Sequence, residues 1–156
     1  MKRNTVIGLL MALLISASFA SFGEKMIKPL SEHKPVLSDT FKTLLANADV
    51  AKGEMTFMRK CSSCHDQQQE GGHGKGPHLW NLFGRKAGSA MDFEYSDAMR
   101  SSGHTWDLAT LNYYLTRTDA AVPGRSMNFR GIRRDKVRAN LLAFLMQFND
   151  NPPALP

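Results

Sequence analysis

Cysteine is scarce in this chain, with two residues among 156, and the two stand close together as Cys61 and Cys64. Such a low number excludes a scaffold held by several disulfide bonds. The chain also lacks low-complexity tracts and any repeat with a period of about 20 to 50 residues. No segment alternates convincingly between apolar and polar residues as a half-buried strand would. The length and the 42% apolar share therefore indicate one small helical domain with an appendage.

Long apolar runs are missing except at the N-terminus, where Lys2 and Arg3 precede an apolar stretch over residues 6–15. Residues 18–20 then place small side chains at the two positions that a signal peptidase reads. We expect residues 1–20 to be an export signal and the protein to be periplasmic. The alternative is an uncleaved anchor over residues 5–22, a length marginal for spanning a bilayer, which would tether the protein to the outer face of the inner membrane.

The remaining chain divides by composition into a linker over residues 21–48, a domain over 49–150 and a tail over 151–156. Prolines and mixed charges mark the linker, which has one possible short helix near residues 40–45. The formal net charge is +6, and one basic cluster consists of Arg130, Arg133, Arg134, Lys136 and Arg138. We interpret the cluster as a solvated helix face, or secondly as a docking site for an acidic redox partner. No nucleic-acid-binding motif is present, so nucleic acid is not an expected partner.

Within the domain, hydrophobic spacing predicts three helices joined by long loops. Asp49 can cap a helix that runs to Cys61, and Asp107 can cap another that runs through Leu115. A last helix has its apolar face between Val137 and Phe148 and ends before the Pro152-Pro153 pair. The long loops between residues 71 and 89 are unusual for so small a domain and suggest that they wrap a cofactor.

Both cysteines belong to the segment Cys61-Ser62-Ser63-Cys64-His65, which has the spacing of covalent haem attachment. Residues three or four apart on a helical turn face the same way, so each thiol can add to one vinyl group of the same haem. His65 would then lie beneath the iron. This interpretation consumes both thiols and predicts neither a disulfide nor a free cysteine.

Three other uses of the cysteine pair are open to a chain of this kind. A disulfide is the ordinary expectation for two cysteines in an exported protein. A thiol oxidoreductase needs a βαβ context, and no strand pattern precedes this motif. A structural zinc site needs further ligands, and His73, His78 and His104 do not recur at a zinc spacing.

The second axial ligand decides between a closed electron carrier and an open site that binds small molecules. Met11 belongs to the export signal, and Met55, Met58 and Met146 fall in predicted helices, where this residue usually packs a core. Met127 instead follows Pro123-Gly124, which fix a loop, so its thioether can be aimed at a cofactor. We take Met127 as the candidate ligand, with His78 and His104 as alternatives.

Residues 49–149 resemble the class I c-type cytochromes of the mitochondrial type and their bacterial relatives. The resemblance covers about two thirds of the chain, and its landmarks recur in order. They are Gly53, Phe57, the Cys61–His65 motif, Gly76-Pro77, Leu82-Phe83-Gly84-Arg85-Lys86, Phe93-Glu94-Tyr95-Ser96-Asp97-Ala98, Trp106, Leu111, Tyr114, Pro123-Gly124, Met127, Phe129 and the segment Arg138–Leu145.

The resemblance implies an all-α cytochrome c fold wrapped around one haem c that is bound covalently through Cys61 and Cys64. It makes His65 and Met127 the iron ligands, with the Pro77 carbonyl orienting the His65 ring. The other implied haem contacts are Arg85, Tyr95 and Trp106 at the propionates, Tyr114 at the methionine sulfur and Phe129 beside the ligand loop.

The function implied is that of an electron carrier and not an enzyme, with outer-sphere transfer of one electron in a respiratory or photosynthetic chain. Its partners would be redox proteins, such as a quinol–cytochrome c reductase as donor and a terminal oxidase or other reductase as acceptor. Four positions depart from the mitochondrial pattern. Met99 replaces an asparagine, Arg125 replaces a small hydroxyl residue, and Asp119-Ala120 stand where a lysine pair often guides docking.

Overall fold

The computed structural model describes residues 27–155, so the expected export signal and the alternative anchor lie outside the described residues. Its helices are α1 (Asp39–Ala46), α2 (Val50–Lys60), α3 (Asp97–Ser101), α4 (Leu108–Thr116), α5 (Thr118–Ala121) and α6 (Asp135–Leu145). Between residues 27 and 155 there is no strand, only the isolated bridges His65–His73 and Lys86–Thr105. The all-α prediction is confirmed. No helix of this part of the chain is long and apolar enough to cross a membrane.

Local capping explains where the two predicted long helices begin. The Asp49 carboxylate accepts a hydrogen bond from the Lys52 backbone N–H at 3.0 Å, which satisfies a free donor at the start of α2. Asp107 does the same for Thr110 at 2.7 Å, and the Thr110 hydroxyl accepts from the Asp107 N–H at 2.8 Å. This reciprocal capping box fixes the start of α4. Both predicted starts are confirmed.

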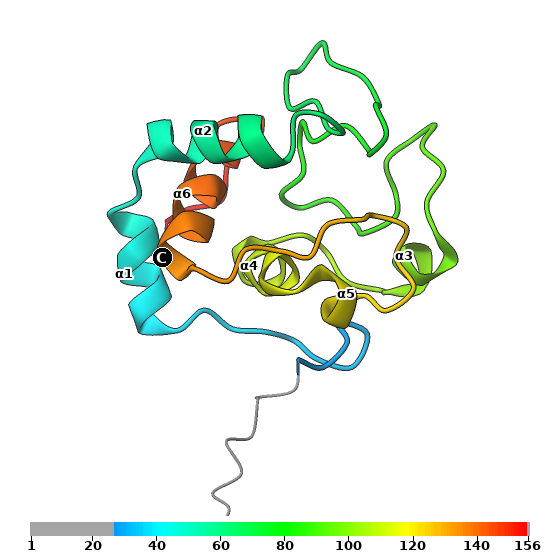
Figure 1. Cartoon of the computed structure of the whole chain (residues 1–156), viewed down its shortest axis with the longest axis horizontal. Helices are drawn as coiled ribbons and strands as arrows, with labels where there is room; N and C mark the ends of the chain where they lie inside the picture. The colour runs from blue at the N-terminus through cyan, green and yellow to red at the C-terminus, as the bar shows by residue number, and fades with distance from the viewer. Residues whose placement is uncertain (1–26, 156) are drawn as a thin grey trace, which may run out of the picture.

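The first and last helices of the domain, α2 and α6, cross at Gly53 (Figure 1). A β-carbon at Gly53 would lie 2.1 Å from the Asn140 carbonyl oxygen, so only glycine permits this approach. The Asn140 side chain accepts from the Asp49 N–H at 3.0 Å, and the rings of Phe57 and Phe144 lie 5.5 Å apart. The crossing thus joins residues about 90 positions apart and closes one side of the domain.

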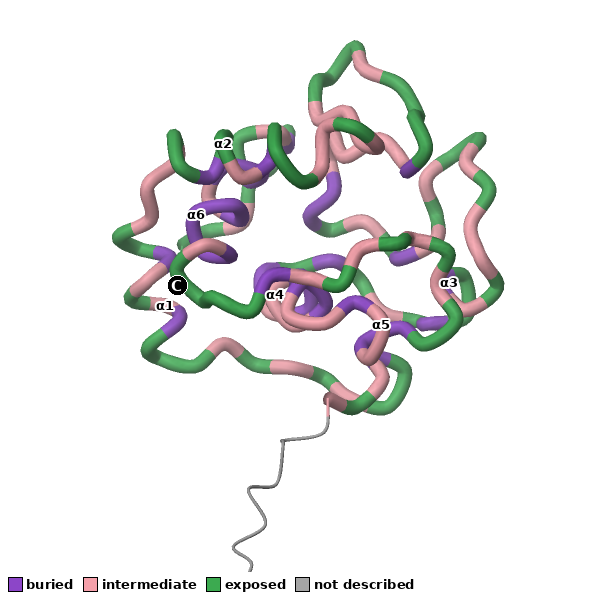
Figure 2. The backbone as a smooth tube through the Cα atoms, viewed as in Figure 1, coloured by how far each residue is buried: buried purple, intermediate pink, exposed green. Residues whose placement is uncertain are grey.

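The segment expected as a linker is packed against the domain over residues 27–48. We call residues 27–38 the strap; α1 follows it and contacts α6. Leu30, Phe41 and Leu45 are buried, and the rest of the stretch is a mixture of exposed and half-buried residues (Figure 2). Their apolar side chains explain the packing, because burying each removes its surface from water.

Arg138 corrects the interpretation of the basic cluster as a solvated face. Arg130, Arg133, Arg134 and Lys136 are exposed, whereas Arg138 is only 4% exposed. Its guanidinium donates to the Asn112 side chain at 2.8 Å, to the Ile132 and Arg133 carbonyls and to Asp135, and it lies 5.7 Å from the Phe41 ring centre. Burial is possible because the charge is paired and its N–H donors are used.

Candidate haem-binding site

The attachment motif forms a tight turn at the end of α2. Cys61 caps the helix, and the backbone N–H groups of Cys64 and His65 both donate to the Cys61 carbonyl, at 3.0 and 2.9 Å. Both thiols are unpaired and half-buried. Burial raises the pKa of the Cys61 thiol to about 11, since a thiolate would lose its hydration.

The His65 ring is held from two sides. Its Nδ1 lies 2.8 Å from the Pro77 carbonyl oxygen, and because a carbonyl can only accept, Nδ1 carries the proton. The Nε2 lone pair is then available to a metal. Burial lowers the pKa of His65, so the ring is neutral at pH 7 and suited to ligation. On the other side, Gly76 leaves no room for a β-carbon, which would lie 2.3 Å from Cε1.

Met127 lies in the loop that follows α5, and the structure brings it to Tyr114 of α4. The Tyr114 hydroxyl donates to the Met127 sulfur at 3.9 Å. Burial raises the pKa of Tyr114 well above its usual value, so the phenol keeps its proton. The Tyr114 ring lies 5.1 Å from the ring of Trp106, which is buried at 7% exposure.

The methionine loop, which we define as residues 122–130, is fastened to α5 by side-chain hydrogen bonds. Arg125 donates from Nε to the Thr118 hydroxyl at 2.9 Å and from Nη2 to the Phe129 carbonyl at 3.2 Å. The Thr118 hydroxyl itself donates to the same carbonyl. Sequence reasoning treated Arg125 only as a departure from the family pattern, and no local signal predicted this role.

The three residues expected at the propionates lie on three different segments. Arg85 donates to the carbonyls of His78 at 2.8 Å and Trp80 at 3.3 Å, so part of its guanidinium is committed to the backbone. Burial raises the pKa of the half-buried Tyr95, and the nearby Arg85 charge opposes that rise. Trp106 is tied to the Arg85 segment by its backbone N–H, which donates to the Arg85 carbonyl at 2.9 Å.

Comparison with known proteins decides the family. The sequence model described as Cytochrome c matches residues 50–148. A cytochrome c of Chlamydomonas reinhardtii is 42% identical over 99 residues, covering 64% of this chain and 88% of that protein. A cytochrome c2 of Rhodomicrobium vannielii is 46% identical over 100 residues, covering 64% of this chain and 79% of that protein. A cytochrome c homolog of Bradyrhizobium diazoefficiens is 33% identical over 120 residues, covering 76% of this chain and 65% of that protein. The chain belongs to the cytochrome c family.

Membership settles the use of the cysteine pair. This cytochrome c carries one haem c bound covalently through Cys61 and Cys64, and it is an electron carrier that works with redox-protein partners. The disulfide, thiol-redox and zinc interpretations are therefore set aside. Among residues 27–155 there is also no cluster of three His, Cys, Asp or Glu side chains that could hold a metal ion.

The described side chains fit a haem. Two unpaired thiols stand one turn apart, and a neutral imidazole keeps one nitrogen lone pair available. A further sign is His104, whose two ring nitrogens are buried without a hydrogen-bond partner, 4.3 Å from the Trp106 ring centre. A buried polar group without a partner is costly, so an external acceptor or donor is expected there. Sequence reasoning considered His104 as a zinc ligand and as an alternative iron ligand, and it missed this position beside Trp106.

Proposed function

We propose that His65 and Met127 are the two axial ligands and that this cytochrome c is a closed, one-electron carrier. The observation that carries the proposal is the contact between the Tyr114 hydroxyl and the Met127 sulfur, made by a loop that is fastened at Arg125. A thioether held in one place by a donor is pre-organised for ligation, as a merely packed methionine is not. The paired contact of His65 with Pro77 supports the opposite ligand in the same way.

The bound haem supplies one-electron chemistry at iron, and the protein holds and tunes it. Cys61 and Cys64 keep the group attached, and Pro77 fixes the His65 tautomer. Trp106 and Tyr114 are buried and keep water away from the methionine side. A thioether ligand in an apolar pocket favours the reduced state and raises the potential. No residue is required as nucleophile, acid or base, so we infer that the protein is not an enzyme.

A haem enzyme such as a peroxidase, or a gas sensor, would need an open or displaceable sixth position. Absorption spectra of the holoprotein separate these functions. We expect a methionine–iron band in the oxidised protein and no spectral change when carbon monoxide is added to the reduced protein. Ready binding of carbon monoxide would instead indicate an enzyme or sensor.

The ligand itself is tested by Met127→Leu, a replacement of similar volume that lacks the thioether. We expect this variant to lose the methionine–iron band and to bind carbon monoxide. Met99→Leu is the matched control, since Met99 is a buried methionine that lies outside the methionine loop, in α3. Unchanged spectra in Met127→Leu would assign the ligand to another residue, such as His78 or His104.

We further propose that the protein is exported to the periplasm and acts in a respiratory or photosynthetic chain. The charged start and apolar run of residues 1–20 support export. The donor would be a quinol–cytochrome c reductase and the acceptor a terminal oxidase or other reductase. Exposed Arg130, Arg133 and Arg134 suit an acidic partner surface. Mass spectrometry of the mature protein distinguishes a released carrier, which begins near residue 21, from one that keeps an anchor over residues 5–22.

A further inference from the structure

The strap lies outside the region that matches the family, which begins at residue 50, yet it is bound to the domain at the base of the methionine loop. Leu30 is 5% exposed, and its backbone N–H donates to the Ala121 carbonyl at 2.8 Å. Ala121 is the last residue of α5, and Val122 after it begins the methionine loop. The strap thus supplies a partner for a backbone carbonyl directly before that loop.

A second tie joins the strap to α4. The Tyr113 hydroxyl donates to the Lys28 carbonyl at 2.9 Å, and the His33 ring lies 5.0 Å from the Tyr113 ring. Tyr113 precedes Tyr114, the residue whose hydroxyl contacts the Met127 sulfur. The strap therefore contacts both elements that position the methionine, α4 through Tyr113 and the end of α5 through Leu30.

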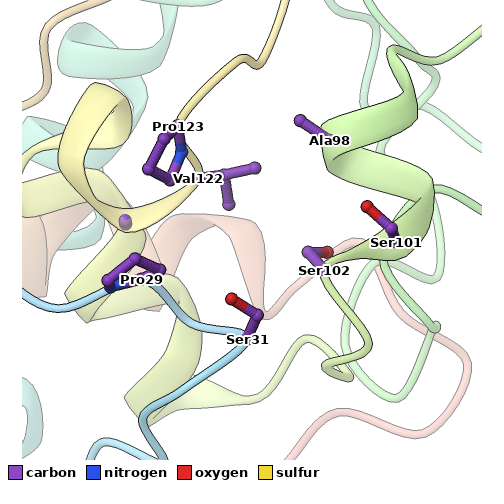
Figure 3. Close-up of a pocket in the computed structure, with 8 residues that line it drawn as sticks. Pro29, Ser31, Ala98, Ser101, Ser102, Val122 and Pro123 are labelled. Atoms are coloured by element: carbon purple, nitrogen blue, oxygen red, sulfur yellow. The ribbon is translucent and has the colours of Figure 1, made fainter.

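The strap also walls a cavity of about 320 Å³ beside the loop. Figure 3 shows Pro29 and Ser31 of the strap near Val122 and Pro123, with the α3 residues on the other side. α3 also approaches the loop, because a β-carbon on Gly124 would lie 3.2 Å from the Ala98 side chain. The start of the loop is therefore enclosed between the strap and α3.

We propose that the strap is a brace that keeps the methionine loop closed over the haem, with Leu30 as its main positioning residue. The proposal rests on the proposed function, in which Met127 ligates the iron. A loop attached at both ends can open by local unfolding while the core stays folded. Contacts made by the strap at Ala121 and Tyr113 exist only when the base of the loop is in place, so they lower the population of the open form.

The helix α1, which follows the strap, contains a matched control for the effect of the strap on the loop. Leu45 is 1% exposed and lies in α1, which packs on α6 on the side of the domain away from the methionine loop. Leu30→Ala and Leu45→Ala remove the same atoms from buried positions, and both positions lie within residues 27–48. Only the first lies on the strap, next to the backbone hydrogen bond that joins Leu30 to Ala121 at the base of the loop.

The experiment uses the full-length holoprotein and imidazole, a small ligand for ferric haem iron that binds only where the sixth position is vacant. Because such a ligand binds the open form alone, its apparent affinity rises in proportion to the open fraction. We expect Leu30→Ala to raise imidazole affinity about tenfold at pH 7, and Leu45→Ala to leave it near the wild-type value. Denaturant unfolding of both variants checks that global stability falls in each.

Tyr113→Phe is the second variant, since it removes one hydrogen bond without a cavity and keeps the proposal testable if Leu30→Ala does not fold. It should also raise imidazole affinity, by a smaller factor than Leu30→Ala. Equal affinities in Leu30→Ala and Leu45→Ala, or no change in Tyr113→Phe, would overturn the brace. Met127→Leu separates the two proposals. If it opens the site while the strap variants do not, the brace alone fails, whereas an unchanged site in Met127→Leu rejects the ligand and the brace together.

Discussion

A β-carbon on Gly76 would lie 2.3 Å from Cε1 of His65 and 2.7 Å from both ring nitrogens, so the Gly76 backbone rests against the imidazole ring. This contact and the Pro77 carbonyl together fix the ring plane.

Gly76→Ala is therefore expected to turn the His65 ring away from its position, at a cost of about 1–3 kcal/mol for the overpacked methyl group. The expected result is a lower yield of holoprotein and a shifted reduction potential, measured by redox titration. Gly72→Ala is the control, because no atom lies within 4 Å of a β-carbon there. Equal potentials in both variants would show that the Gly76 contact does not orient the ligand.

Arg138→Lys tests the buried charge that joins α6 to α1 and α4. Lysine keeps the charge but has a single ammonium group in place of the planar fork that reaches Asn112, two carbonyls and Asp135. We expect the free energy of unfolding to fall by about 2–3 kcal/mol, measured in guanidinium chloride. Arg134→Lys at an exposed position should change it little. Similar losses in the two variants would contradict the role given to Arg138.

The three tyrosines give a prediction for alkaline pH. Burial raises the pKa of Tyr95, Tyr113 and Tyr114 above 10, most strongly for Tyr114. Since the unfolded chain ionises near pH 10 and the folded chain does not, the stabilisation is complete below that pH and is lost as pH rises above it. Ultraviolet difference titration should find each tyrosine less than half ionised at pH 10, with the last step absent in Tyr114→Phe. A tyrosine that ionises below pH 10 would refute this expectation.

His104 gives a prediction about the haem pocket. If a haem carboxylate accepts a hydrogen bond from the protonated ring nitrogen of His104, His104→Leu should lower the free energy of unfolding of the holoprotein by about 1–3 kcal/mol and shift its reduction potential. His104→Gln keeps hydrogen-bonding groups and should restore part of the stability and part of the original reduction potential. An equally stable or more stable His104→Leu variant would mean that the imidazole has no polar partner in the holoprotein.

Features written in short sequence segments could be predicted, and those made by tertiary packing could not. Asp49 and Asp107 predict where α2 and α4 begin, because a capping side chain bonds to a backbone N–H only three residues away. The short helices α3 and α5 carry too few residues for a periodic pattern, although Ser96 does cap α3. Met127 could be proposed as a ligand because proline and glycine mark its loop. That a residue is a ligand, however, depends on what the rest of the fold brings opposite it.

The strap and Arg138 show that burial produced by distant residues could not be predicted from the sequence. Leu30 lies between prolines and charges, and it is buried in a fold that brings its backbone N–H to the Ala121 carbonyl, about 90 positions along the chain. Arg138 stands among exposed basic residues, and its burial depends on Asn112, 26 positions away. Arg125 was visible only as a departure from the family, and its hydrogen bonds to Thr118 and Phe129 give that departure a reason.

Packing of the strap also sets how far the domain could move from a membrane. A free linker over residues 21–48 would extend to roughly 90 Å, enough for the carrier to swing between distant partners. With residues 27–48 folded onto the domain, an anchor ending at residue 22 would leave four residues, a reach of at most about 14 Å. The strap leaves the domain beside α5 (Figure 1). A retained anchor would therefore keep the carrier close to the bilayer, attached on its α5 side, and restrict it to partners within lateral diffusion of that membrane.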